Sequence, residues 1–181
     1  MKQLLLPLVI AVASFASPPH AQASLVRAMD LAELTATAEL IVVADVAKVE
    51  SRWDKDHRTI FSTIEIRVQE SWKGPPPAEG RMVLRQPGGS VGEIEMTVVG
   101  MPTFSAGERA LLFLDRASVV GRAQGKRRLR WDEAGKRWLA GPGDASSAVH
   151  IDQRGQIRAA PASPAETLDG LRAQVRALLE K

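Results

Sequence analysis

The sequence predicts a mainly β domain, an OB-like antiparallel barrel or alternatively a β-sandwich, with a short N-terminal helix and a C-terminal amphipathic helix. Three observations support this fold class. Short apolar or alternating stretches that suit strands recur along the chain, and turns rich in glycine and proline separate them. Helical patterns that would alternate with strands in an α/β protein do not interrupt this series.

Residues 1–23 have the pattern of a secretory signal peptide. Lys2 provides the positive start, an apolar run follows, and Ala21 and Ala23 occupy the small positions that signal peptidase reads. The apolar run is shorter than the roughly 20 residues of a membrane-spanning helix. We therefore expect cleavage after Ala23, export to the periplasm or the extracellular space, and a mature chain without a transmembrane segment.

The remaining chain has the length of one domain with its own core. We expect a β-barrel-like domain at 24–158, a linker at 159–163 and a helix at 164–180 that packs on the domain. The chain has no cysteine, which excludes disulfides and thiolate metal sites. No cofactor motif is found, so neither a cofactor nor a metal is expected.

The first elements follow from the spacing of apolar residues. Residues 27–38 have the period of a short amphipathic helix. β-Branched residues at 40–49 predict a buried strand, and strict alternation at 60–69 predicts a second strand. The prolines at 75–77 end that stretch, because proline cannot donate a hydrogen bond to a ladder.

Shorter strands are predicted beyond this point. They lie at 81–85, 93–99, 109–114 and 119–120, followed by hairpins that join 128–131 to 136–139 and that span 149–157. Ser163, Pro164 and Glu166 have the spacing of a capping box at the start of the C-terminal helix. The apolar stripe expected to be buried on this helix consists of Leu168, Leu171, Val175, Leu178 and Leu179.

The layout of residues 38–75 resembles the N-terminal domain of the tissue inhibitors of metalloproteinases and the related netrin-like module. The resemblance rests on the strand Val43-Ala-Asp-Val-Ala-Lys-Val49, the polar excursion, the second strand and Trp72-Lys-Gly-Pro75. It implies an OB-fold. Those inhibitors hold their target's zinc through an N-terminal cysteine, which this chain lacks. Their mechanism and their site residues are therefore not transferred.

A second pattern resembles that of uncharacterised exported bacterial proteins, some of which precede a zinc protease domain. It consists of Pro87-Gly-Gly, Gly100-x-Pro-x-Phe104 and Gly107-Glu-Arg-x-Leu-Leu-Phe-Leu114. The zinc-binding pattern His-Glu-x-x-His is missing from the sequence, so such a protease would be a different chain.

Basic residues concentrate in one part of the chain. Residues 116–138 hold eight basic and two acidic residues, a net charge of +6, while the rest of the chain beyond Ala23 carries −4. The leading hypothesis is a non-enzymatic interaction module that binds a protein or an anionic surface; nucleic acid is not expected in an exported protein. Solvated arginines on a hairpin are the simpler alternative. The candidate binding residues are Arg127, Arg128, Arg130, Trp131 and Trp138.

Two further motifs are weaker candidates. Gly88-Gly-Ser-Val-Gly92 matches the nucleophile elbow of a serine hydrolase, with His150 as the base that would assist Ser90. A strand pattern rather than a helix follows it, which favours a glycine-rich turn. Asp54, Asp56 and His57 could contact a cation, but calcium loops need more ligands, which favours a solvated hairpin tip.

Overall fold

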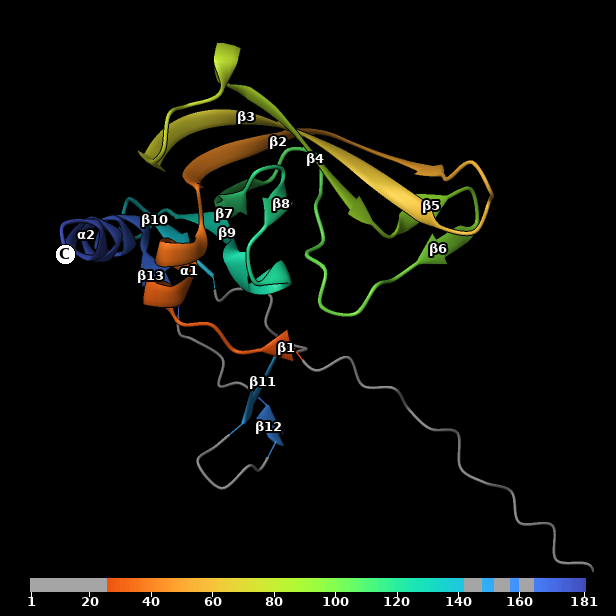
Figure 1. Ribbon diagram of the computed structural model, residues 1–181. Helices are drawn as coiled ribbons and strands as arrows, with labels where there is room; N and C mark the ends of the chain where they lie inside the picture. The colour runs from red at the N-terminus through yellow and green to blue at the C-terminus, as the bar shows by residue number, and fades with distance from the viewer. Residues whose placement is uncertain (1–25, 142–147, 152–156, 160–164) are drawn as a thin grey trace, which may run out of the picture.

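The computed structural model describes residues 26–141, 148–151, 157–159 and 165–181. The fold is mainly β, as predicted, and one antiparallel sheet dominates it (Figure 1). Its strands lie in the order β13-β10-β9-β7-β2-β3-β4, and β8 pairs with β7. In the part of the chain described, no helix is long and apolar enough to span a membrane.

The two longest strands form a curved hairpin, β2 (Leu40–Trp53) and β3 (Ile60–Lys73). Both extend beyond their predicted ends, because the antiparallel ladder continues after the apolar pattern stops. The polar cluster after β2 forms the tip of this hairpin, where Oδ1 of Asp54 accepts a hydrogen bond from the Arg58 amide at 2.7 Å.

The rest of the main sheet contains β4 (Arg81–Pro87), β7 (Arg109–Asp115), β8 (Ser118–Val119), β9 (Lys126–Asp132), β10 (Arg137–Ala140) and β13 (Glu166–Thr167). The predicted apolar strand at 109–114 is β7, which is central and lies between β2 and β9. The predicted β9–β10 hairpin is confirmed, with Trp131 opposite Trp138. Among the described strands, β4 and β13 at the two ends of the order do not pair with each other, so these ladders do not close a barrel.

Two small sheets complete the strands. The first pairs β5 (Gly89–Val91) with β6 (Ile94–Met96), and the second contains β1 (Val26–Arg27), β11 (Ala148–Ile151) and β12 (Ile157–Ala159). The antiparallel β11–β12 pair confirms the predicted last hairpin. The predicted strand at 93–99 is shorter, and the preceding glycine-rich segment is itself a strand rather than only a turn, because the chain reverses at 92–93.

The first helix, α1 (Leu31–Thr37), begins four residues later than predicted. Asp30 caps it: Oδ1 of Asp30 accepts from the Glu33 amide at 2.8 Å, and the Glu33 carboxylate accepts from the Asp30 amide at 3.1 Å. This reciprocal capping fixes the start of the helix. Two short 3₁₀ turns, η1 (Ala78–Gly80) and η2 (Arg122–Gly125), precede β4 and β9.

The predicted start of the C-terminal helix is wrong. The helix α2 spans Leu168–Leu179, and Thr167 caps it by accepting from the Gly170 amide at 3.1 Å. Glu166 pairs with β10 as part of β13, so the chain stays extended until the cap. Ser163, Pro164 and most of the expected linker lie outside the described residues, whereas Ala159 belongs to β12. Residues 1–23 also lie outside the described residues.

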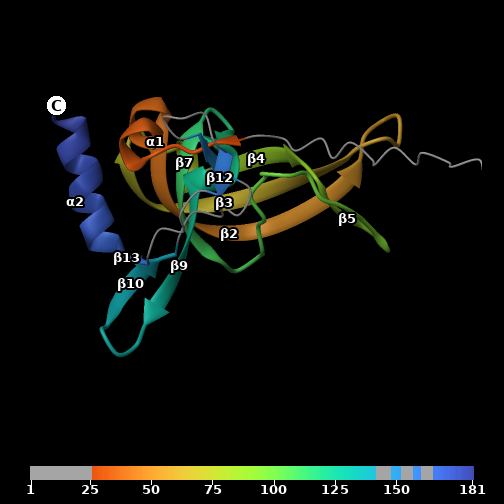
Figure 2. The same ribbon diagram turned by 90° about the horizontal axis from the view of Figure 1, so that it is seen from below.

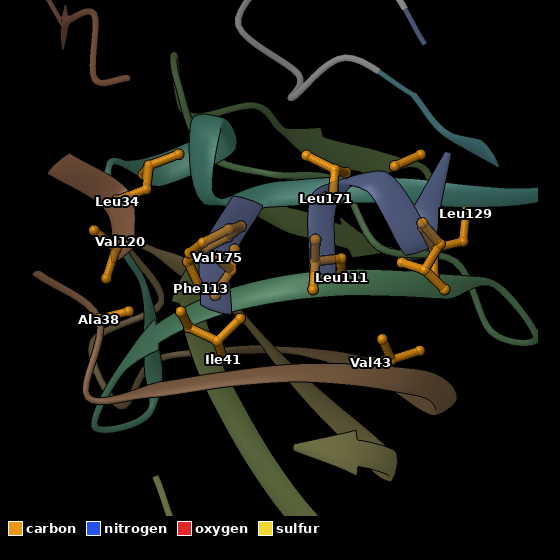
Figure 3. Close-up of a cluster of buried hydrophobic side chains, with 12 residues drawn as sticks. Leu34, Ala38, Ile41, Val43, Leu111, Phe113, Val120, Leu129, Leu171 and Val175 are labelled. Atoms are coloured by element: carbon orange, nitrogen blue, oxygen red, sulfur yellow. The ribbon is translucent and has the colours of Figure 1, made fainter. Parts of the chain in front are cut away.

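Buried side chains form two clusters, one on each face of the main sheet. The residues of β7 alternate between them, which explains why this central strand is apolar throughout. Helices α1 and α2 cover one face, where Leu34, Phe113, Leu171 and Val175 meet (Figure 3). Of the predicted stripe on α2, Leu168, Leu171 and Val175 are buried, but Leu179 is 41% exposed.

Candidate functional site

The β9–β10 hairpin projects beyond the body of the sheet (Figure 2). The rings of Trp131 and Trp138 pack edge to face across it, with 5.4 Å between their centroids. The guanidinium of Arg109 lies 4.8 Å from the centre of the Trp138 ring and donates to Asp45 at 2.6 Å. This series of contacts holds Trp138 in place and leaves Trp131, its outermost member, 39% exposed.

The five predicted binding residues do not form one surface. Side chains alternate along a strand, so neighbours in β9 point to opposite faces of the sheet. Trp131 and Trp138 lie on the face that the helices cover, since Trp138 packs against that cluster. Arg128 lies on the opposite face, because it contacts Glu108 next to the second cluster, and Arg130 follows it there at a spacing of two.

Arg127 is buried rather than exposed, at 8%. Its Nη1 lies 3.6 Å from the Glu166 carboxylate, and its Nε and Nη1 make no hydrogen bond. Burial lowers the pKa of this guanidinium, and the charge of Glu166 opposes that effect only in part. Arg127 therefore does not contribute to the exposed basic surface that the sequence predicted.

Lys126 is also buried, in an ion pair with Glu108. Its Nζ lies 2.6 Å from Oε1 of Glu108, donates to the carbonyl oxygen of Thr103, and lies 4.4 Å from the centre of the Phe104 ring. Arg128 approaches the other carboxylate oxygen at 3.1 Å without the alignment of a hydrogen bond. Glu108 therefore contacts both basic side chains, but lysine is its buried partner.

The exposed positive charge of the hairpin comes from four side chains, Arg128, Arg130, Lys136 and Arg137, and the exposed Glu133 at its tip carries a negative charge. Arg137 lies 3.5 Å from Asp132, a loose contact for an ion pair. The described structure shows no ion pair for Arg130 or Lys136. The hairpin therefore presents an exposed indole on one face and the arginines of β9 on the other.

A second candidate site was not predicted from the sequence. A groove of about 330 Å³ lies between the β5–β6 hairpin and the loop at 97–104. Its lining includes Ser51, Ser62, Glu95, Met96, Met101 and Phe104. The lining comes from both long strands, β4, the small hairpin and the loop, so no local motif could reveal it.

Hydrogen bonds fix both walls of this groove. Ser62 donates to the carbonyl oxygen of Gly88 at 2.7 Å, and Gly89, at a φ of +125°, lies where a Cβ would overlap the Ser51 and Ser62 hydroxyls. Across the groove, the Gln86 amide donates to the carbonyl oxygen of Pro102 at 2.6 Å. Pro87-Gly-Gly and Gly100-x-Pro-x-Phe104, two parts of the pattern that resembles exported bacterial proteins, therefore build the walls.

The weaker candidates have ordinary structural positions. Ser90 lies in β5 opposite Glu95, and β6 rather than a helix follows it, so the strand-to-helix elbow is not formed there. The backbone of His150 belongs to β11, and its side chain lies outside the described residues. No group of three or more potential metal ligands is found in the described part of the chain, and Asp54 serves the hairpin tip.

Comparison with known proteins adds no family to this geometry: no family model and no curated protein matches the chain. The resemblances to the netrin-like module and to exported bacterial proteins remain inferences from the sequence. Two surfaces of the molecule bear on its function, the β9–β10 hairpin and the groove beside β5.

Proposed function

We propose that the protein is an exported, non-enzymatic interaction module with an OB-like scaffold, and that its β9–β10 hairpin contacts an anionic partner. One observation carries the proposal: Trp131 is 39% exposed on a projecting hairpin that also bears exposed arginines. Tryptophan and arginine are the residue types enriched among the side chains that dominate binding energy. The alternative, a hairpin whose arginines are only solvated, does not explain why a tryptophan is exposed there.

The packing below Trp131 supports a binding role. Asp45, Arg109 and Trp138 form the series of contacts that positions the indole. A side chain that is already ordered loses less conformational entropy when it binds. The exposed cations nearby attract an anionic partner over a longer range and orient its approach.

Retention on immobilised heparin tests this role. Replacing Arg128 and Arg130 together by glutamine should lower the salt concentration at which the protein elutes, because both cations lie on the hairpin. The matched control replaces Arg52 and Arg58, two exposed arginines near the tip of the β2–β3 hairpin, in the same way. An equal shift in both proteins would show that retention depends on net charge alone.

Trp131→Ala separates the indole from the charges. It should weaken retention at salt concentrations where arginine contacts are screened. The protein should stay folded with a modestly lower thermal midpoint, because the partly exposed ring also packs on Trp138. Unchanged retention would remove Trp131 from the proposed surface.

Export is part of the proposal and has its own test. The mature protein should begin at Ser24, as the small residues before it indicate. Intact-mass measurement of the exported protein checks this, and a mass that includes Met1 contradicts it.

A further inference from the structure

The groove has the chemistry to receive an apolar group that carries positive charge. Met96, Met101 and Phe104 provide flexible and aromatic apolar contacts, and Glu95 contributes a carboxylate. None of the described side chains that line the groove is basic. Glu95 lines the groove and Glu93 is exposed in the turn of the same hairpin, so this wall carries negative charge. On the opposite wall, Arg122 donates to the carbonyl oxygen of Val99.

The β9–β10 hairpin of the same protein carries the complementary groups. Trp131 offers a partly exposed indole, and Arg128, Arg130 and Arg137 offer exposed cations. The two hairpins lie at different ends of the main sheet in both views (Figures 1 and 2), so a chain cannot place its own tip in its own groove. A contact between these two surfaces can therefore form only between two copies.

We propose that the groove beside β5 binds the β9–β10 hairpin tip of a second copy, with Trp131 against the methionines and Phe104, and with arginines against Glu93 and Glu95. This inference rests on the proposed function, since it names a partner for that same hairpin. The exposed charges support it: the β9–β10 hairpin carries Arg128, Arg130, Lys136 and Arg137, and the β5–β6 hairpin carries Glu93 and Glu95. Opposite charges on these two surfaces favour a head-to-tail approach. The groove is also within the size range of sites that hold small ligands, roughly 300 Å³ and above.

The contact is heterologous, because the two surfaces differ. Each added copy leaves one groove and one hairpin tip free, so association produces a ring or an open chain. This predicts a distinctive response to mutation. A change in either surface should stop self-association, yet each variant should keep one intact surface.

Sedimentation velocity of the purified protein tests the proposal. The wild type should show concentration-dependent association below about 100 µM, since specific interfaces have dissociation constants of about micromolar or tighter. Trp131→Ala and Glu95→Arg should each sediment as monomers. Glu180→Arg, the same charge change at an exposed position near the end of α2, should associate like the wild type.

Mixing the two monomeric variants tests directly whether the hairpin of one copy binds the groove of another. The Glu95→Arg protein supplies an intact hairpin and the Trp131→Ala protein an intact groove, so the mixture should form a one-to-one complex. A monomeric wild type, or a mixture of folded variants that stays monomeric, overturns the proposal. Association that Trp131→Ala abolishes but Glu95→Arg does not would instead indicate pairing between two hairpins and also overturns it.

The heparin experiment distinguishes failure of the proposed binding function from failure of the proposed self-association. If the hairpin arginines control heparin retention while the wild type is monomeric, the proposed function stands and the self-association fails. If the arginines do not affect retention, the proposed function fails in its own test.

Discussion

The ammonium of Lys126 lies 2.6 Å from a carboxylate oxygen of Glu108, and their side chains are only 5% and 8% exposed. The pair joins the start of β9 to the residue before β7. Through the carbonyl oxygen of Thr103 and the ring of Phe104, it also holds the loop that forms one wall of the groove. The stability of the fold and the shape of the groove therefore depend on the same buried charges.

Removal of one partner should be costly, because the other charge stays buried. Glu108→Ala leaves Lys126 without its carboxylate and should destabilise the protein by about 3–5 kcal/mol. Lys126→Met should cost less, because Arg128 remains 3.1 Å from Glu108. Chemical denaturation measures both values.

The double variant Glu108→Leu with Lys126→Met tests whether the loss comes from an isolated charge. It should recover part of the stability that Glu108→Ala loses, since an apolar pair carries no uncompensated charge. A double variant less stable than either single one contradicts this account.

The Trp-Lys-Gly segment that carries the netrin-like resemblance has a structural role. Nζ of Lys73 donates to the carbonyl oxygens of Thr35 at 2.7 Å and Ala36 at 3.3 Å, which places a cation at the C-terminal end of α1. Gly74 has a φ of +77°, and a Cβ there would lie 2.5 Å from the carbonyl oxygen of Glu39.

Gly74→Ala should therefore combine backbone strain with a steric clash and lower the free energy of unfolding by about 2 kcal/mol or more. Gly92→Ala is the matched control, because Gly92 has a φ of +61° but no atom within 4 Å of its Cβ position. Its cost should be the strain alone, about 1 kcal/mol. Equal losses in thermal or denaturant unfolding would mean that the Glu39 carbonyl moves away freely.

The ion pair between Asp45 and Arg109 predicts a loss of stability in acid. Hydrogen bonds from Arg109, helped by the charges of Arg109 and Arg67, lower the pKa of Asp45 against the opposing effect of burial. A pKa that is lower in the folded state adds stability above the ordinary pKa, and this stability is lost as the pH falls through the folded-state value.

Asp45→Asn should reduce stability at pH 7 by less than about 1 kcal/mol, since both side chains are nearly a third exposed and solvent screens them. The wild type and the variant should approach equal stability in strong acid. Denaturation at neutral and acidic pH checks this. Asp115→Asn, an exposed position without an ion pair in the described structure, should change stability little at either pH.

Local patterns in the sequence predicted most of the strands, because the alternation of β3 and the apolar run of β7 are recorded in consecutive residues. The start of α2 could not be predicted in this way. The local capping box competed with a ladder to β10, about 25 residues away in the chain, and the ladder prevailed. The groove was missed for the same reason, since its walls meet only in the folded chain.

The basic hairpin shows what a count of charges leaves out. Because side chains alternate along a strand, the sequence already placed Arg127 on one face of β9 and Arg128 and Arg130 on the other. The sequence did not reveal which face of the sheet α2 and its flanking residues would cover. The covered face determines which arginine is buried. Lys126 shows the same limit, because its partner Glu108 is distant in sequence.

Arg127 gives the last prediction, since it separates a buried charge from a binding group. Its guanidinium is nearly enclosed, 3.6 Å from Glu166, and two of its nitrogens lack hydrogen bonds. Replacing Arg127 by an apolar side chain of similar length removes a buried charge whose nitrogens are incompletely paired, and the remaining Glu166, at 34% exposed, stays hydrated. Arg127→Met should therefore unfold at the same denaturant concentration as the wild type or a higher one.

Arg128→Met, on the opposite face, is the matched variant. It should leave stability nearly unchanged but weaken heparin retention, whereas Arg127→Met should not weaken retention. A clear loss of stability in Arg127→Met, or reduced retention with an intact fold, would show that Arg127 contributes more than its buried contacts indicate.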